Sequence, residues 1–96
     1  MRFDWDEVKN RRNLEKHKIS FETASLVFDD PNARSIQDRV VNGEERWQTV
    51  GMVSGLIVLV AHTYRGKGDE ELIRIISARK ATPAERRAYE GHETPG

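Results

Sequence analysis

Four runs rich in Val, Ile, Thr and aromatic residues, joined by short connections, constrain the fold of this chain most. They cover residues 33–41, 44–53, 56–65 and 70–79, and this composition is typical of β-strands. Asn42-Gly43 favours a two-residue turn with positive φ at both positions, Ser54-Gly55 gives a similar but weaker signal, and residues 66–69 form a longer glycine loop. Because short turns join antiparallel neighbours, the sequence predicts a four-stranded antiparallel meander.

Helices are predicted before and after the meander. Residues 3–17 begin like a strand and become helical, with Asp4 or Asp6 as the N-cap, and residues 19–31 give a second helix capped by Ser20. We therefore predict an α+β fold in which two N-terminal helices cover one face of the sheet, with or without a short N-terminal strand.

The last helix carries the clearest start signal in the chain. Residues 82–90 place Thr82 at the N-cap, Pro83 at the first helical position and Glu85 at the third, which is the pattern of a capping box. We predict a C-terminal helix here, a single domain over residues 1–90 and a flexible tail over residues 91–96.

The length and composition of the chain limit its class. A chain of 96 residues without cysteine forms one domain with no disulfide and no thiolate metal site. The N-terminus lacks the apolar stretch of a signal peptide, and the longest apolar run, residues 56–61, is too short to span a bilayer. These features predict a cytoplasmic protein with no membrane association.

Two-residue turns also fix which residues face each other across the strands. They predict Arg39 opposite Arg46 and Trp47 opposite His62, and a four-residue third loop would pair Arg65 with Glu70. One face is then an apolar core: Ile36, Val40, Trp47, Thr49, Val53, Leu56, Val58, Val60, His62, Ile73 and Ile75. The other face is basic and polar: Gln37, Arg39, Arg46, Gln48, Thr63, Arg65, Arg74 and Lys80, beside Val50, Leu59 and Ile76. A bulge in the last strand would exchange Arg74 for Ser77 and Arg79 on the basic face.

The charge is balanced overall but uneven along the chain. A net charge of zero argues against a protein that binds nucleic acid with its whole surface. Near the C-terminus, however, a single acid, Glu85, accompanies five cations: Arg74, Arg79, Lys80, Arg86 and Arg87. Guanidinium groups donate paired hydrogen bonds to phosphates, so a local phosphate-binding patch is predicted. The alternative for each single cation is an ordinary solvated charge.

Several blocks of the sequence together resemble the BrnT family of bacterial ribonuclease toxins. These blocks are "FDWDEVKNRRNLEKHKISFETASLVFDDP", "GEERWQTVG", "LIVLVAHTYR" and "IRIISARKATPAERRAYE", and they cover nearly the whole chain. The resemblance implies a RelE-like fold and a metal-independent endoribonuclease, without cofactors, that inhibits translation and growth. It also implies neutralisation by a BrnA-type antitoxin with a ribbon-helix-helix region, through which the pair binds operator DNA. One departure is Lys18, where the family usually has glycine.

Metal-independent RNA cleavage uses the 2′-hydroxyl as nucleophile, and the enzyme must move two protons and stabilise a phosphorane. We predict that Arg65 and Arg79 converge on one anionic pocket as catalytic cations, with His62 as the acid–base candidate. Predicted RNA-binding residues are Arg46, Arg74, Lys80, Tyr64 and Tyr89. The alternatives are an ion pair with Glu44 or Glu70 for Arg65, core packing for His62, and packing for each tyrosine. The three histidines are dispersed, so no metal site is predicted.

A second function class remains open from the sequence. The chain would then be a non-catalytic module that binds RNA or a protein partner and acts mainly as a co-repressor with its DNA-binding partner.

Glu44 and Glu45 are adjacent in a strand and point to opposite faces, so they do not form a paired-carboxylate site.

Overall fold

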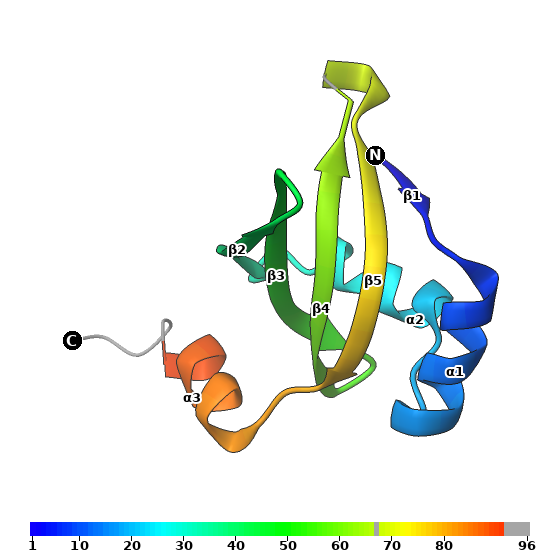
Figure 1. Ribbon diagram of the computed structural model, residues 1–96. Coiled ribbons are helices and arrows are strands. Elements are labelled where there is room, and N and C mark those ends of the chain that lie inside the picture. Colours follow the sequence, from blue (N-terminus) through cyan, green and yellow to red (C-terminus); the bar gives the residue numbers. More distant parts are fainter. Residues whose placement is uncertain (67, 92–96) are drawn as a thin grey trace.

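The computed structural model describes residues 1–66 and 68–91. Of the predicted tail over residues 91–96, Gly91 ends the last helix, and residues 92–96 lie outside the described residues. The elements in chain order are β1 (Arg2–Asp4), α1 (Glu7–His17), α2 (Phe21–Ser25), the 3₁₀ helix η1 (Leu26–Asp29), β2 (Arg34–Val41), β3 (Glu44–Val53), β4 (Leu56–Arg65), the 3₁₀ helix η2 (Gly68–Glu70), β5 (Leu72–Lys80) and α3 (Pro83–Gly91). Figure 1 shows α1 and α2 beside β5, with α3 at the end of the sheet where β5 stops. Within the described residues, no helix has the length and apolar character needed to cross a bilayer.

The sheet contains the predicted meander and one further strand. Strands β2 to β5 pair antiparallel with their chain neighbours, and β1 adds to β5 in parallel, so the order is β1-β5-β4-β3-β2. The parallel pairing is possible because helices and three strands separate β1 from β5 in the chain. The α+β prediction is confirmed, but the sheet has five strands and is mixed rather than purely antiparallel.

The predicted helix starts are present. The Asp6 side chain caps α1 by accepting from the amides of Val8 and Lys9, and Ser20 caps α2 by accepting from Thr23. In the capping box of α3, the Glu85 amide donates to Thr82 Oγ1 over 3.2 Å and the Thr82 amide donates to Glu85 Oε1 over 2.9 Å. The second predicted helix is split into α2 and η1.

Lys18 ends α1 in the left-handed conformation, with φ 63° and ψ 24°. We expect Lys18→Gly to raise the free energy of unfolding by about 1 kcal/mol, because glycine adopts this conformation without Cβ strain. The hydrogen bond from the residue 18 amide to the Leu14 carbonyl, 2.9 Å long, is kept. Urea denaturation measures the change. The control is Lys16→Gly, within the helix, which should lower stability by about 1 kcal/mol; equal effects of both variants would contradict the interpretation.

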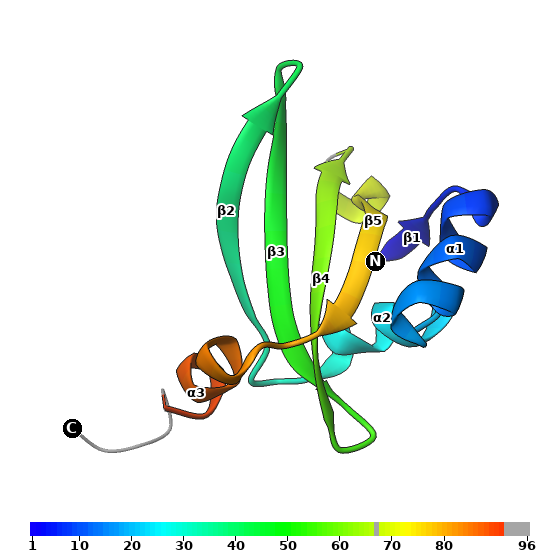
Figure 2. The same ribbon diagram turned by 60° about the horizontal axis from the view of Figure 1, so that its bottom comes forward.

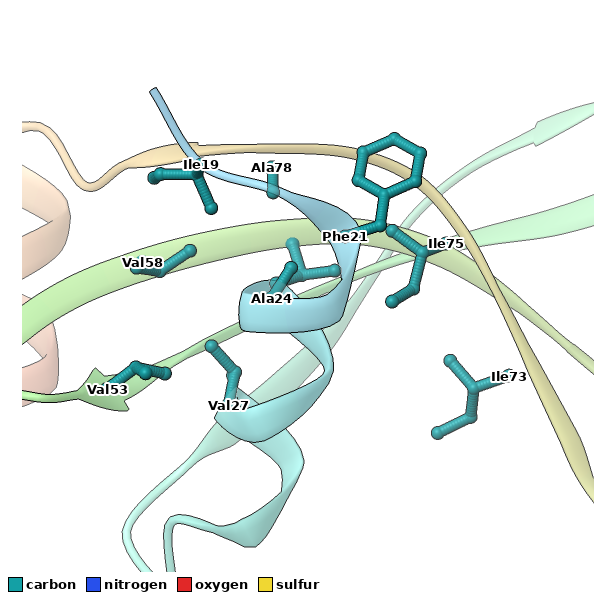
Figure 3. Close-up of a cluster of buried hydrophobic side chains, with 10 residues drawn as sticks. Ile19, Phe21, Ala24, Val27, Val53, Val58, Ile73, Ile75 and Ala78 are labelled. Carbon is teal, nitrogen blue, oxygen red and sulfur yellow. The ribbon is translucent and has the colours of Figure 1, made fainter. Parts of the chain in front are cut away.

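The core lies between the sheet and the segment from Ile19 to Val27, which includes α2 and the start of η1 (Figure 3). Its buried members are Ile19, Phe21, Ala24, Val27, Val53, Val58, Val60, Ile73, Ile75 and Ala78. The Asn13 side chain joins α1 to β5 by donating to the Ala78 carbonyl and accepting from the Ala78 amide, over 2.8 and 3.1 Å. These contacts fix α1 against the stretch of β5 that β1 does not cover.

A bulge changes the predicted register between β2 and β3. Gln37 lies opposite Trp47 and Val40 lies opposite Glu45, so Asp38 and Arg39 together oppose one residue. That residue is Arg46, so the predicted register holds from the turn as far as Arg46 and is shifted by one residue beyond it. The bulge moves Ile36 off the core face, and this residue is 62% exposed. Val40, also predicted as core, lies opposite Glu45 on the turn side of the bulge and is 59% exposed.

The register between β4 and β5 differs as well. Arg65 lies opposite Leu72 rather than Glu70, because residues 68–70 form η2 and lengthen the connection. A second bulge, between Ala61 and His62, places Arg79 opposite Leu59 and Lys80 opposite Val58. Arg79 therefore joins Arg74 on the face away from α1 and α2, whereas the prediction of Lys80 on that face is wrong.

Candidate nucleic-acid interface

We call the sheet face turned away from α1 and α2 the open face. By strand alternation and the observed pairing it carries successive rows across β3, β4 and β5. From the end nearest η2 these rows are Glu44 with Arg65; Arg46, Thr63 and Arg74; Gln48, Ala61 and Ser77; and Val50, Leu59 and Arg79. Cations therefore occur along most of the length of this face.

The second of these rows, Arg46, Thr63 and Arg74, is the cation row. Thr63 lies opposite Arg74, and the pairing of Trp47 with His62 places Arg46 beside Thr63 on the other side. Thr63 is only 1% exposed. Within the described part of the chain, Arg46 Nε and Thr63 Oγ1 are two of three buried side-chain polar atoms without a hydrogen-bond partner. Leaving a buried polar group unpaired costs about 1–3 kcal/mol, so this row is suited to an added anionic group.

Acidic side chains pair with two arginines of the open face, Arg74 in the cation row and Arg65 in the row next to it. Arg74 Nη1 donates to Asp4 Oδ2, and the parallel pairing of β1 with β5 brings Asp4 to this position. Arg65 Nη2 lies 3.2 Å from Glu44 Oε2, and its Nε donates to the same oxygen over 3.3 Å. The ion pair with Glu44 that the sequence offered as the alternative for Arg65 is therefore present. Both pairs are partly exposed, and their guanidinium groups have further donors to offer.

Arg79 links β5 to α3. Its guanidinium donates two hydrogen bonds to the Glu85 carboxylate, over 2.7 and 2.9 Å. These bonds are the main reason that the pKa of Glu85 is lowered to about 2, and the same bonds raise the pKa of Arg79. Because Glu85 also belongs to the capping box, Arg79 anchors the first turn of α3.

The two arginines predicted to converge lie at opposite ends of the open face. Arg65 is the last residue of β4, and Arg79 pairs with Leu59, six positions earlier on that strand. At the strand rise this is about 20 Å. Figure 1 shows the corresponding ends of the sheet leading to η2 and to α3. Since each arginine also engages its own carboxylate, the predicted shared pocket is wrong.

His62 lies on the helix-covered face, as its predicted pairing with Trp47 implied. Its side chain is 0% exposed, its Nε2 is 2.7 Å from Thr49 Oγ1, and its ring packs against Phe28 and Tyr64 with centroid distances of 5.0 and 4.9 Å. Burial lowers the pKa of His62 to about 4. The structure does not bring this residue to the cation row, and its predicted catalytic role gains no support from the geometry.

The two tyrosines predicted to bind RNA lie apart. Tyr64 packs edge-on against Trp47 with a centroid distance of 5.5 Å, at the margin of the helix-covered face. Tyr89 is 5% exposed, and its hydroxyl donates to Asp30 Oδ2 over 2.5 Å. Tyr89 nevertheless contributes to a hollow of about 420 Å³ between α3 and the open face, lined by Arg34, Ser35, Ile36, Gln48, Val50, Leu59, Glu85, Ala88 and Tyr89.

Sequence reasoning missed part of this surface. Arg34 and Ile36 enter the hollow because of the β2 bulge, and no residue pattern in β2 marks that bulge. Asp4 was considered as a helix cap, yet it binds Arg74.

In the described part of the chain, no group of three or more His, Asp or Glu side chains is arranged to hold a metal ion.

The chain was compared with models of known protein families. A family model described as "Ribonuclease toxin, BrnT, of type II toxin-antitoxin system" matches residues 5–85. The chain belongs to this family. The predicted resemblance is thereby confirmed, and the match includes the whole open face of β3, β4 and β5. The family is one of ribonuclease toxins that have an antitoxin protein as partner. A search of curated proteins found no match.

Proposed function

We propose that this chain is a metal-independent endoribonuclease toxin that cleaves RNA, thereby inhibits translation and growth, and is neutralised by a BrnA-type antitoxin. The observation that carries the proposal is the cation row, where buried Arg46 Nε and Thr63 Oγ1 have no partner among the described residues. A single-stranded RNA would place the scissile phosphate there, since the sheet presents several cations side by side. The antitoxin would carry a ribbon-helix-helix region and take the pair to operator DNA.

Charge stabilisation is the part of the mechanism that the row supplies. Attack of the 2′-hydroxyl oxygen on the adjacent phosphorus expels the 5′-oxygen and passes through a phosphorane with increased negative charge. The guanidinium groups of Arg46 and Arg74 donate hydrogen bonds to the non-bridging oxygens as that charge grows. Arginine suits this task because it keeps its proton at any physiological pH.

Glu44 is the carboxylate best placed to take the proton of the 2′-hydroxyl. It lies two residues before Arg46 on β3, so both side chains project from the same face. Arg65 holds the carboxylate in place through two nitrogen contacts. We therefore assign Glu44 as general base and Arg65 as its positioning cation, with water protonating the departing 5′-oxygen at this partly exposed surface.

The test uses purified chain freed of its partner and incubated with RNA in EDTA. We expect fragments ending in 2′,3′-cyclic phosphate, loss of cleavage when the antitoxin is added, and growth arrest on expression that the neighbouring open reading frame relieves. RNA that stays intact with correctly folded protein contradicts the proposal. Tight RNA binding without products and without growth arrest would instead support the co-repressor alternative.

A further inference from the structure

A second set of cations lies on α1, outside the open face. Lys9, Arg12 and Lys16 are spaced by three and four residues, so they occupy one side of the helix. All three are exposed. The ion pairs found among the described residues are those of Arg65, Arg74 and Arg79, and none involves these three cations. We call this set the α1 stripe.

The α1 stripe borders a hollow that reaches the open face. This hollow of about 210 Å³ is lined by Lys9, Arg12, Asn13, Lys16, His17, Ile76 and Ser77. Ser77 pairs with Ala61 in the row next to the cation row, and Ile76 is the extra residue of the β5 bulge. Because β1 pairs only with residues 72–74 of β5, no strand pairs with the β5 edge beyond them, and α1 packs there through Asn13 and Ala78. Figures 1 and 2 both show α1 on the side of β5 where β1 pairs, farther from β5 than β1 is.

We propose that the α1 stripe binds the sugar-phosphate backbone of the RNA strand whose scissile phosphate lies at the cation row. This inference rests on the proposed function and extends it: the strand crosses the edge of β5 at the hollow near Ser77 and continues along α1. The three cations are about 4.5 and 6 Å apart along the helix axis, a spacing that lets them contact successive phosphates. Such contacts are independent of base sequence.

The chemistry of the hollow favours a nucleic acid over a protein segment. Ile76 is the apolar member of its lining, and the other lining residues are polar or charged. Protein interfaces have apolar, charge-depleted centres, whereas backbone contacts to nucleic acid come from exposed Lys and Arg. Ser77 lines this hollow and belongs to the row next to the cation row, so the hollow joins the stripe to the open face around the edge of β5, a path that suits a long flexible strand.

Charge reversal at two adjacent arginines tests the inference. Arg12 belongs to the stripe, while Arg11 lines a different hollow with Glu7 and Glu22, toward α2. Arg12→Glu and Arg11→Glu change the net charge equally, so they differ only in the surface that they alter. Binding is measured by fluorescence anisotropy with a 20-nucleotide RNA bearing 2′-O-methyl groups, which lacks the nucleophile. We expect Arg12→Glu to weaken Kd on the order of tenfold and Arg11→Glu less than twofold. Triple alanine replacement of the stripe should reduce the slope of log K against log salt by about 2.

The outcomes separate this inference from the proposed function. Wild-type protein that neither binds nor cleaves RNA would overturn both. Wild-type cleavage with equal RNA affinities of the two charge reversals would overturn the stripe alone. Unchanged RNA affinity together with weakened antitoxin binding by Arg12→Glu would also overturn it, since the surface would then be a protein interface. Cleavage of a trinucleotide should be unaffected by Arg12→Glu, and unchanged urea midpoints show that both variants are folded.

Discussion

Replacing Arg46 with alanine is expected to lower kcat/KM for RNA cleavage on the order of 10²–10³-fold, with little change in stability. Removing one preorganised donor to a developing oxyanion has an effect of this size. Among the described residues, Arg46 forms no ion pair with an acidic side chain. Its Nε is buried without a partner in the same part of the chain. The loss should appear mainly in kcat, because the phosphate carries its greatest charge in the transition state.

Two comparisons make this result specific to the cation row. Arg11→Ala removes the same charge from the side of α1 that faces α2 and should cleave like wild type. Thr63→Val deletes a buried hydroxyl without a partner among the described residues, so its stability should stay equal or rise by up to about 1 kcal/mol, while kcat/KM falls about tenfold. Full activity of Arg46→Ala with normal folding would remove the row from the mechanism.

Short-range signals in the sequence predicted the local structure well. Asn42, Gly43, Ser54 and Gly55 have positive φ values of 52°, 78°, 49° and 80°, as the turn residues indicated. The capping box at Thr82 formed as predicted. Each of these features depends on residues within three positions of one another, so the sequence contains all the information that they need.

The candidate site was harder to predict because it depends on two bulges. Residues 38–39 in β2 and Ile76 in β5 insert single residues that no local pattern marks. Each bulge exchanges the faces of every residue beyond it. The β2 bulge is the reason that Ile36 was wrongly predicted as core, whereas Arg65 was wrongly paired with Glu70 because η2 lengthens the third connection. The convergence of Arg65 with Arg79 was predicted without a measure of distance along the strand, and about 20 Å of sheet separates them.

The largest stability effect is expected from acid, through His62. Its pKa is lowered from 6.5 to about 4 by burial, so the unfolded chain takes up this proton before the folded chain does. The contribution of neutral His62 is therefore complete above pH 6.5 and is lost as the pH falls toward 4. Over that range we expect the free energy of unfolding to fall by roughly 3 kcal/mol on this account, since one pKa unit corresponds to about 1.4 kcal/mol.

Urea denaturation at several pH values between 7 and 4 measures this loss. Other groups titrate over the same range, so the informative quantity is the difference between wild type and His62→Gln, in which position 62 does not titrate. The variant should have a flatter pH dependence even if it is less stable at pH 7, and parallel curves would show that His62 does not sense acid. His62 is 0% exposed and bound to Thr49 on the helix-covered face, so it does not reach a phosphate at the cation row. We therefore expect His62→Gln to cleave RNA at pH 7, which would show that His62 takes no part in the reaction.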